Sequence, residues 1–392
     1  MPRLFRLLMT LVIVALVTAC AAAPAAAPAA APDSSAPAPD AGAPAATGPA
    51  FDPAVDKSKL VAQINFLNWT DYLAPEILTN FEATYGVKVV VDNFDANEDM
   101  IAKIRAGGSG YDLVTPSDYA VQTMAAEGLL QPLDKALLTN STHIEPSLLN
   151  KYFDEGNTYS IPYMYGITGI AYNKKTFPIP PNSWSTIFDI KNLEQYKGQF
   201  SMLDDEREVP GAALKYFGYS LNETNPEAVA RVQELLIAQK PFLASYNSSD
   251  VNRKLSSGEY LFAHAWSGQA MQARNGLGDE FSGNPDIGFV IPKEGGMIWM
   301  DNMVVLKESP NAYTVHVFMN YLLDPSVAAL NTEYIGYLTP NKDAIPLLDP
   351  TIGALYAEGF SPDAEVMKRL EWAIRNESTA VFSDVWTAVK GE

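Results

Sequence analysis

Cysteine is almost absent from this chain of 392 residues, and Cys20 is the single one. No internal disulfide can form, so the stability of the fold has to come from a packed core. Histidine is also scarce: the three histidines, His143, His264 and His316, lie far apart and lack the spacing of metal ligands or of a catalytic base with its partners. We therefore expect neither a metal ion nor a cofactor.

Motifs for nucleotide binding and for serine hydrolysis are missing as well. The glycine-rich residues 107–110 lack the Lys-Ser/Thr that a phosphate loop needs. Gly276 and Gly278 lack the third glycine of a dinucleotide fingerprint, and no Gly-x-Ser-x-Gly elbow is present. The glycines are more simply explained as helix ends and turns.

Positive charge is in deficit. Lys and Arg number 27 against 46 Asp and Glu, a formal net charge of −19. Such a surface repels nucleic acid and anionic headgroups and attracts cations. We therefore expect no nucleic-acid partner, although acidity also serves solubility and does not by itself identify a ligand.

The N-terminus has the features of an export signal. Arg3 and Arg6 precede an apolar run, residues 7–17, that is short for a membrane span. Val17-Thr18-Ala19-Cys20 then resembles a lipobox, with small residues before a cysteine that can be cleaved behind and acylated. We predict a lipoprotein signal peptide at residues 1–19, a lipid anchor at Cys20, and a location on the membrane surface outside the cytoplasm of a bacterium. The alternatives are an ordinary secretory signal with a chance cysteine and a short membrane anchor.

An Ala/Pro-rich stretch follows the cysteine and predicts a tether over residues 20–55. From about Leu60 onward, short β-branched strands alternate with helical patterns that end at glycine, which favours a parallel α/β sheet. The expected strands are residues 60–67, 87–91 and 111–114, and the expected helices are residues 75–85, 100–105, 117–128, 310–323 and 325–334.

An acidic cluster at residues 204–208 is the strongest candidate for chemistry. In a helix or a turn, Asp205 and Glu208 would face the same way. Paired carboxylates can act as general acid and base in a hydrolase, can bind an ammonium group, or can form a solvated face with Arg207. Spacing alone favours the solvated face.

Six ordered segments together resemble one family, the spermidine/putrescine-binding receptors of bacterial ABC importers. The resemblance covers the chain from about Leu60 to the C-terminus. The segments are Asn68-Trp69-Thr70-Asp71-Tyr72, residues 111–119, residues 159–173, the acidic cluster before Val209, residues 292–301 with Trp299-Met300-Asp301, and residues 335–341.

This resemblance implies a two-lobed α/β fold of the periplasmic-binding-protein type II class, with a hinge and a ligand cleft between the lobes. Lobe one would be residues 60–168 plus 298–345, and lobe two residues 169–297 plus 346–392. The protein would be a monomer that captures polyamines and delivers them to an ABC-transporter permease, and it would not be an enzyme.

The resemblance also implies the ligand-binding residues. Carboxylates would pair with the amines, and aromatic rings would cover the methylenes and attract the ammonium groups, each ring contributing roughly 0.5–2 kcal/mol. The implied acids are Asp71, Asp205, Glu208 and Asp301; the aromatic residues are Trp69, Tyr72, Tyr119, Trp266, Trp299 and Tyr337; the hydroxyl residues are Thr70, Ser117 and Ser248.

Three departures from the family pattern bear on the length of the ligand. Asp71 replaces the glutamate of spermidine receptors, Ala373 replaces a glutamine, and Pro210 replaces a bulky residue. The Trp299-Met300-Asp301 segment favours spermidine. We predict that spermidine is preferred over putrescine, with a receptor for another cationic or small organic solute, or a hydrolase using Asp205 and Glu208, as alternatives.

Overall fold

The computed structural model describes residues 48–107 and 110–391, and these belong to one compact unit. The predicted signal peptide, the lipid attachment at Cys20 and most of the tether lie outside the described residues. Within residues 48–107 and 110–391, no helix is long and apolar enough to span a bilayer.

The strands form one large mixed sheet and one small hairpin. The large sheet has the order β2-β1-β3-β11-β4-β7-β5-β6, with β10 beside β4 and β12 beside β11. The strands are β1 (Gln63–Trp69), β2 (Lys88–Phe94), β3 (Leu113–Val114), β4 (Ser160–Asn173), β5 (Phe200–Met202), β6 (Ser245–Tyr246), β7 (Phe262–Trp266), β8 (Gly276–Leu277), β9 (Phe281–Ser282), β10 (Ile287–Val290), β11 (Gly296–Val305) and β12 (Leu370–Trp372).

Helices cover the sheet, and short 3-10 turns connect many of the elements. The α-helices are α1 (Pro75–Tyr85), α2 (Asn97–Arg105), α3 (Asp118–Ala126), α4 (Ser185–Phe188), α5 (Ile190–Leu193), α6 (Glu208–Tyr216), α7 (Pro226–Gln239), α8 (Val251–Ser257), α9 (Ser267–Asn275), α10 (Ala312–Leu322), α11 (Pro325–Ile335), α12 (Pro350–Leu355), α13 (Ala364–Met367) and α14 (Val381–Gly391).

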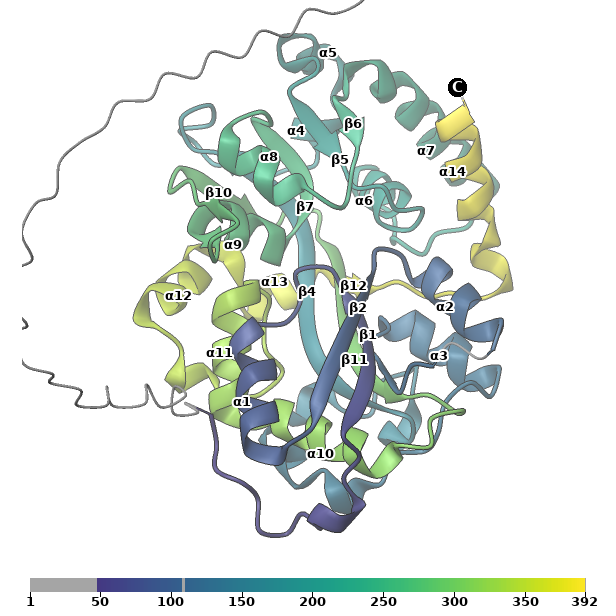
Figure 1. The fold of residues 1–392 in the computed structure, drawn as a ribbon. Helices are drawn as coiled ribbons and strands as arrows, with labels where there is room; N and C mark the ends of the chain where they lie inside the picture. The colour runs from purple at the N-terminus through teal and green to yellow at the C-terminus, as the bar shows by residue number, and fades with distance from the viewer. Residues whose placement is uncertain (1–47, 108–109, 392) are drawn as a thin grey trace, which may run out of the picture. The chain divides into compact units, whose positions relative to one another are not determined.

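The expectation of a parallel sheet is wrong for the central strands. β1 pairs in parallel with β2 and β3, and β5 pairs in parallel with β6 and β7. The long strands β4 and β11 instead run antiparallel to each other, and they also pair antiparallel with β7 and β3 respectively. Figure 1 shows these two strands connecting the strands around β1 with the strands around β5. The antiparallel pair escaped prediction because its strands are separated by more than a hundred residues of sequence.

Each end of the sheet has a hydrophobic core on both of its faces. In β1, Phe66 packs into a core with α1 and α10, whereas its neighbour Leu67 packs into a second core with α2 and α3. In β7, Phe262 packs into a core with α6, α7 and α14, whereas Ala263 packs into one with α8 and α9. The alternation follows from the two-residue period of a strand. The lobe boundaries given above stay a prediction.

Candidate functional site

A pocket with a volume of about 300 Å³ is lined by residues from the elements around β1 and from the elements around β5, the two groups that β4 and β11 connect. Its lining comes from the segments after β1 and β3, from the start of α6, from β7 and α9, from β11, and from the loop after α11. All thirteen of the ligand-binding residues implied by the sequence line this one pocket: Trp69, Thr70, Asp71, Tyr72, Ser117, Tyr119, Asp205, Glu208, Ser248, Trp266, Trp299, Asp301 and Tyr337. Their role in binding stays a prediction.

Asp301 is a buried carboxylate on β11, and 4% of its surface is exposed. Trp299 and Asp301 both reach the pocket because residues two apart on a strand face the same side. The Ser117 hydroxyl donates to Asp301 Oδ1 at 2.7 Å, and the Tyr72 hydroxyl donates to Oδ2 at 2.7 Å. Burial raises the pKa of Asp301 to about 7, although these two hydrogen bonds act in the opposite direction.

Glu208 is the second buried carboxylate and begins α6. Its Oε1 accepts hydrogen bonds from the Thr168 hydroxyl at 2.8 Å and from the Trp266 indole at 2.8 Å. Burial raises the pKa of Glu208 to about 8, and the neighbouring Asp205 raises it further. Asp205 precedes the helix and accepts from the Glu208 backbone N–H at 2.9 Å, so the two acids do not share a helix face. The expectation of a solvated face is therefore wrong for Glu208.

Asp118 is a third buried carboxylate at the pocket, and sequence reasoning missed it. Its two oxygens accept from the backbone N–H groups of Tyr119 at 2.6 Å and of Met300 at 3.3 Å. Burial raises the pKa of Asp118 to about 8. Asn97 was missed as well: its side-chain amide donates to Ser117 Oγ and to the Tyr119 hydroxyl, both at 3.0 Å. The only sequence signal for Asp118 is its position between Ser117 and Tyr119.

Aromatic rings form a continuous series between Glu208 and Asp301. The ring of Trp266, whose indole donates to Glu208, lies 6.3 Å from that of Trp299, which lies 5.3 Å from the Tyr337 ring. The Tyr337 ring lies 5.2 Å from the Tyr72 ring, whose hydroxyl reaches Asp301. Two carboxylates are thus connected by flat apolar surfaces.

Two glycines make room for this series. A Cβ at Gly166, the cross-strand partner of Trp299, would lie 2.3 Å from the Trp299 ring. A Cβ at Gly268 on α9 would lie 2.4 Å from the Tyr337 ring. Such distances are too short for any side chain, so glycine is required at both positions for the rings to lie where they do.

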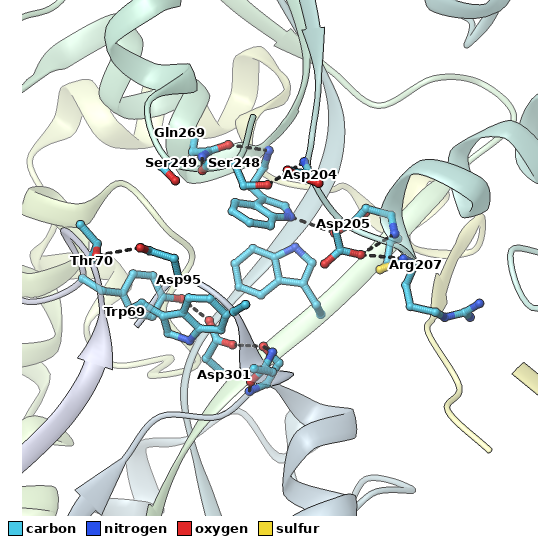
Figure 2. Close-up of a pocket in the computed structure, with 18 of the residues that line it drawn as sticks. Trp69, Thr70, Asp95, Asp204, Asp205, Arg207, Ser248, Ser249, Gln269 and Asp301 are labelled. Atoms are coloured by element: carbon cyan, nitrogen blue, oxygen red, sulfur yellow. Dashed lines mark hydrogen bonds between the residues drawn. The ribbon is translucent and has the colours of Figure 1, made fainter. Parts of the chain in front are cut away.

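The other predicted polar residues mainly bond to the protein itself. The Thr70 hydroxyl donates to Asp95 at 2.9 Å, and Ser248 Oγ accepts from the Asp204 backbone N–H at 2.9 Å. Figure 2 shows Thr70, Asp95 and Asp301 on one side of the pocket and Ser248, Asp204 and Asp205 on the other.

Asp71 is already paired with a cation of the protein. Its φ of 55° is one that aspartate tolerates in a tight turn, and Arg253 Nη2 lies 3.2 Å from its Oδ2. Burial raises the pKa of Asp71, and Glu280 adds to this, whereas Arg253 opposes it. Asp71 is therefore less available to a ligand than the sequence suggested.

No lysine or arginine among the described residues forms an ion pair with Asp118, Asp205, Glu208 or Asp301. Buried carboxylates without a cation are costly in their ionised form. Across residues 48–107 and 110–391, no group of His, Cys, Asp and Glu side chains is arranged to hold a metal ion. The site can therefore stabilise an organic cation that has apolar segments between its charges.

Comparison with known proteins agrees with this chemistry. The family profile "Bacterial extracellular solute-binding protein" matches residues 76–355. A "Putrescine/cadaverine-binding protein" of Pseudomonas aeruginosa is 37% identical over 336 residues, which are 84% of this chain and 93% of that protein. A "Spermidine/putrescine-binding periplasmic protein" of Escherichia coli is 38% identical over 312 residues, which are 78% of this chain and 85% of that protein.

A solved structure shows the same fold. The spermidine/putrescine ABC transporter substrate-binding protein PotD of Streptococcus pneumoniae has a TM-score of 0.72 and 34% identity, covering 84% of this chain and 99% of its own. The predicted periplasmic-binding-protein fold is confirmed. The chain belongs to the bacterial extracellular solute-binding proteins of ABC transporters, and within them to the family of the spermidine/putrescine-binding proteins.

Proposed function

We propose that this protein captures polyamines outside the cytoplasm and delivers them to the permease of an ABC importer. The observation that carries the proposal is the series of rings from Trp266 to Tyr72, with Glu208 at one end and Asp301 at the other. Neither acid forms an ion pair with a lysine or arginine of the described residues. A polyamine has the complementary pattern, because its ammonium groups are separated by methylenes.

The energetics favour such a ligand. Each carboxylate gains a charge-assisted hydrogen bond from an amine, and the burial of methylenes adds about 25 cal/mol per Å². The two relatives from Pseudomonas aeruginosa and Escherichia coli, which are named for binding putrescine, cadaverine or spermidine, support the same class of ligand. The hydrolase alternative is set aside because the family consists of solute-binding proteins.

We further propose that spermidine is preferred over putrescine. Asp118 and Asp205 line the pocket in addition to Glu208 and Asp301, so a third amine can find a carboxylate. A charged hydrogen bond contributes about 1.5–3 kcal/mol net, which predicts a preference of roughly tenfold or more.

Calorimetric titration of the purified protein with putrescine, spermidine and spermine tests both proposals. We expect stoichiometric binding of at least one polyamine and release of putrescine by equimolar spermidine. Failure to bind any polyamine refutes the proposed function; displacement of spermidine by putrescine refutes only the preference.

The lipid anchor is a separate proposal that rests on Val17-Thr18-Ala19-Cys20. We expect Cys20→Ser to abolish acylation and to release the protein from the membrane or to leave an uncleaved precursor. Mass spectrometry of the mature N-terminus after membrane fractionation provides the measurement. A wild-type N-terminus that is cleaved but carries no lipid contradicts the proposal.

A further inference from the structure

Arg375, in the segment after β12, lies against a set of groups that resembles an amine-binding subsite. Its Nη1 is 2.7 Å from Glu98 Oε1 and 3.1 Å from Glu206 Oε1. Its guanidinium carbon lies 3.8 Å from the centre of the Tyr119 ring, and 21% of its side chain is exposed. An aromatic face with two carboxylates is an environment that can bind an ammonium group.

The three partners of Arg375 belong to the pocket. Glu98, Tyr119 and Glu206 all line it, and so does Ala373, two residues before the arginine. Tyr119 was expected to be an aromatic wall for the ligand, but one face of its ring is already covered by the guanidinium.

The rest of the pocket differs from this corner. Glu208 and Asp301 bond to hydroxyl and indole groups and have no ion-pair partner among the described residues. The carboxylates of the pocket thus include some that are paired with an arginine or lysine of the protein and others that are left for a ligand.

We propose that Arg375 is a resident cation that fills one amine subsite and thereby limits the positive charge that a bound polyamine can place in the pocket. This inference rests on the proposed function. A ligand amine directed toward Glu98 and Glu206 meets a like charge, so the amines of the ligand are directed to the carboxylates without an ion pair among the described residues, which are Asp118, Asp205, Glu208 and Asp301. Loss of the guanidinium would open the subsite to a further amine.

The test compares the ratio of spermine affinity to spermidine affinity in matched variants, because spermine carries the further amine that an opened subsite would accept. Arg375→Met removes the charge and keeps much of the length, and we expect the ratio to rise about tenfold, the effect of one newly paired charged amine. Arg375→Lys keeps the charge, and we expect its ratio to stay within about twofold of the wild type. Arg231→Met is the control, because Arg231 also stacks on an aromatic ring, that of Phe217 at 4.2 Å, but Phe217 does not line the pocket, whereas the partners of Arg375 do.

A second variant keeps the proposal testable if Arg375→Met does not fold. The double substitution Glu98→Gln and Glu206→Gln leaves the guanidinium uncompensated beside the pocket. We expect it to lower the same ratio, since a tetracation is repelled more than a trication.

Two results would overturn the inference. One is an equal loss of affinity for both polyamines in Arg375→Met, which would mean that the arginine only braces the fold. The other is a ratio that stays unchanged in both Arg375→Met and the double variant. A wild-type protein that binds no polyamine refutes the proposed function as well, so the two failures are told apart by the wild-type titration.

Discussion

Asp301→Asn is expected to weaken polyamine binding by about 30-fold or more. Removing one partner of a buried charge pair costs about 2–5 kcal/mol, because the remaining charge stays buried without compensation. Asp301 is 4% exposed, and none of the described lysines and arginines forms an ion pair with it. A ligand amine would therefore be its counter-ion in this pocket. Titration calorimetry of the folded variant measures the loss.

The control for this prediction is Asp95→Asn. Asp95 also lines the pocket, but it is exposed and accepts the Thr70 hydroxyl, so water screens its charge. We expect the affinity of the Asp95→Asn variant for polyamines to differ from that of the wild type by less than about threefold. Without ligand, Asp301→Asn should be as stable as the wild type or more so, because a buried carboxylate is replaced by a neutral amide. Equal small effects of both substitutions would contradict the role of Asp301.

Acidification from about pH 8 to about pH 6 is expected to weaken polyamine binding by about 100-fold or more. Burial raises the pKa of Asp118 and of Glu208 to about 8, and that of Asp301 to about 7. A bound ammonium group favours the ionised carboxylate and lowers these values, so binding releases protons. Each released proton gives up to about a tenfold change in affinity per pH unit. The amines of the ligand stay charged throughout this range.

The stability of the ligand-free protein should depend on pH in the opposite direction to the affinity for polyamines. The folded state holds protons on these buried acids at a pH where the unfolded chain has lost them. The free energy of unfolding therefore rises as the pH falls from above about 8 toward the unfolded values near 4.

Calorimetry in buffers of different ionisation enthalpy counts the released protons, and at about pH 6, below the pKa of about 7 that burial gives Asp301, Asp301→Asn should reduce this count by about one. An affinity that is flat between about pH 6 and about pH 8 would show that the carboxylates are already ionised in the empty pocket.

The sequence predicted those helices whose ends are marked by residues such as proline and glycine. As expected, α1 begins at Pro75 and is ended by Gly86, since proline fits the first helical turn and Gly86 adopts a φ of 72°. The helix expected over residues 100–105 starts earlier, at Asn97. Its first turn was not predicted because that turn is polar and has no hydrophobic periodicity. The pairing of β4 with β11 is a long-range property that no local pattern encodes.

The candidate site was predictable only as far as its motifs extend. The resemblance supplied acids and rings such as Glu208, Asp301 and Trp299, and the structure brings them together. The resident cations Arg253 and Arg375 were missed, because their partners Asp71 and Glu98 are more than 180 residues away in the sequence. Counter-ions of this kind depend on tertiary contact, and no spacing rule can find them.

The aromatic lining also makes the protein its own optical probe. Four of the six tryptophans, Trp69, Trp266, Trp299 and Trp386, line the pocket, whereas Trp184 is buried in a core. An amine that replaces water against these indoles changes the polarity around four of the six indole fluorophores of the chain. Binding can therefore be followed by intrinsic fluorescence in unlabelled protein, with Trp184 as a constant background.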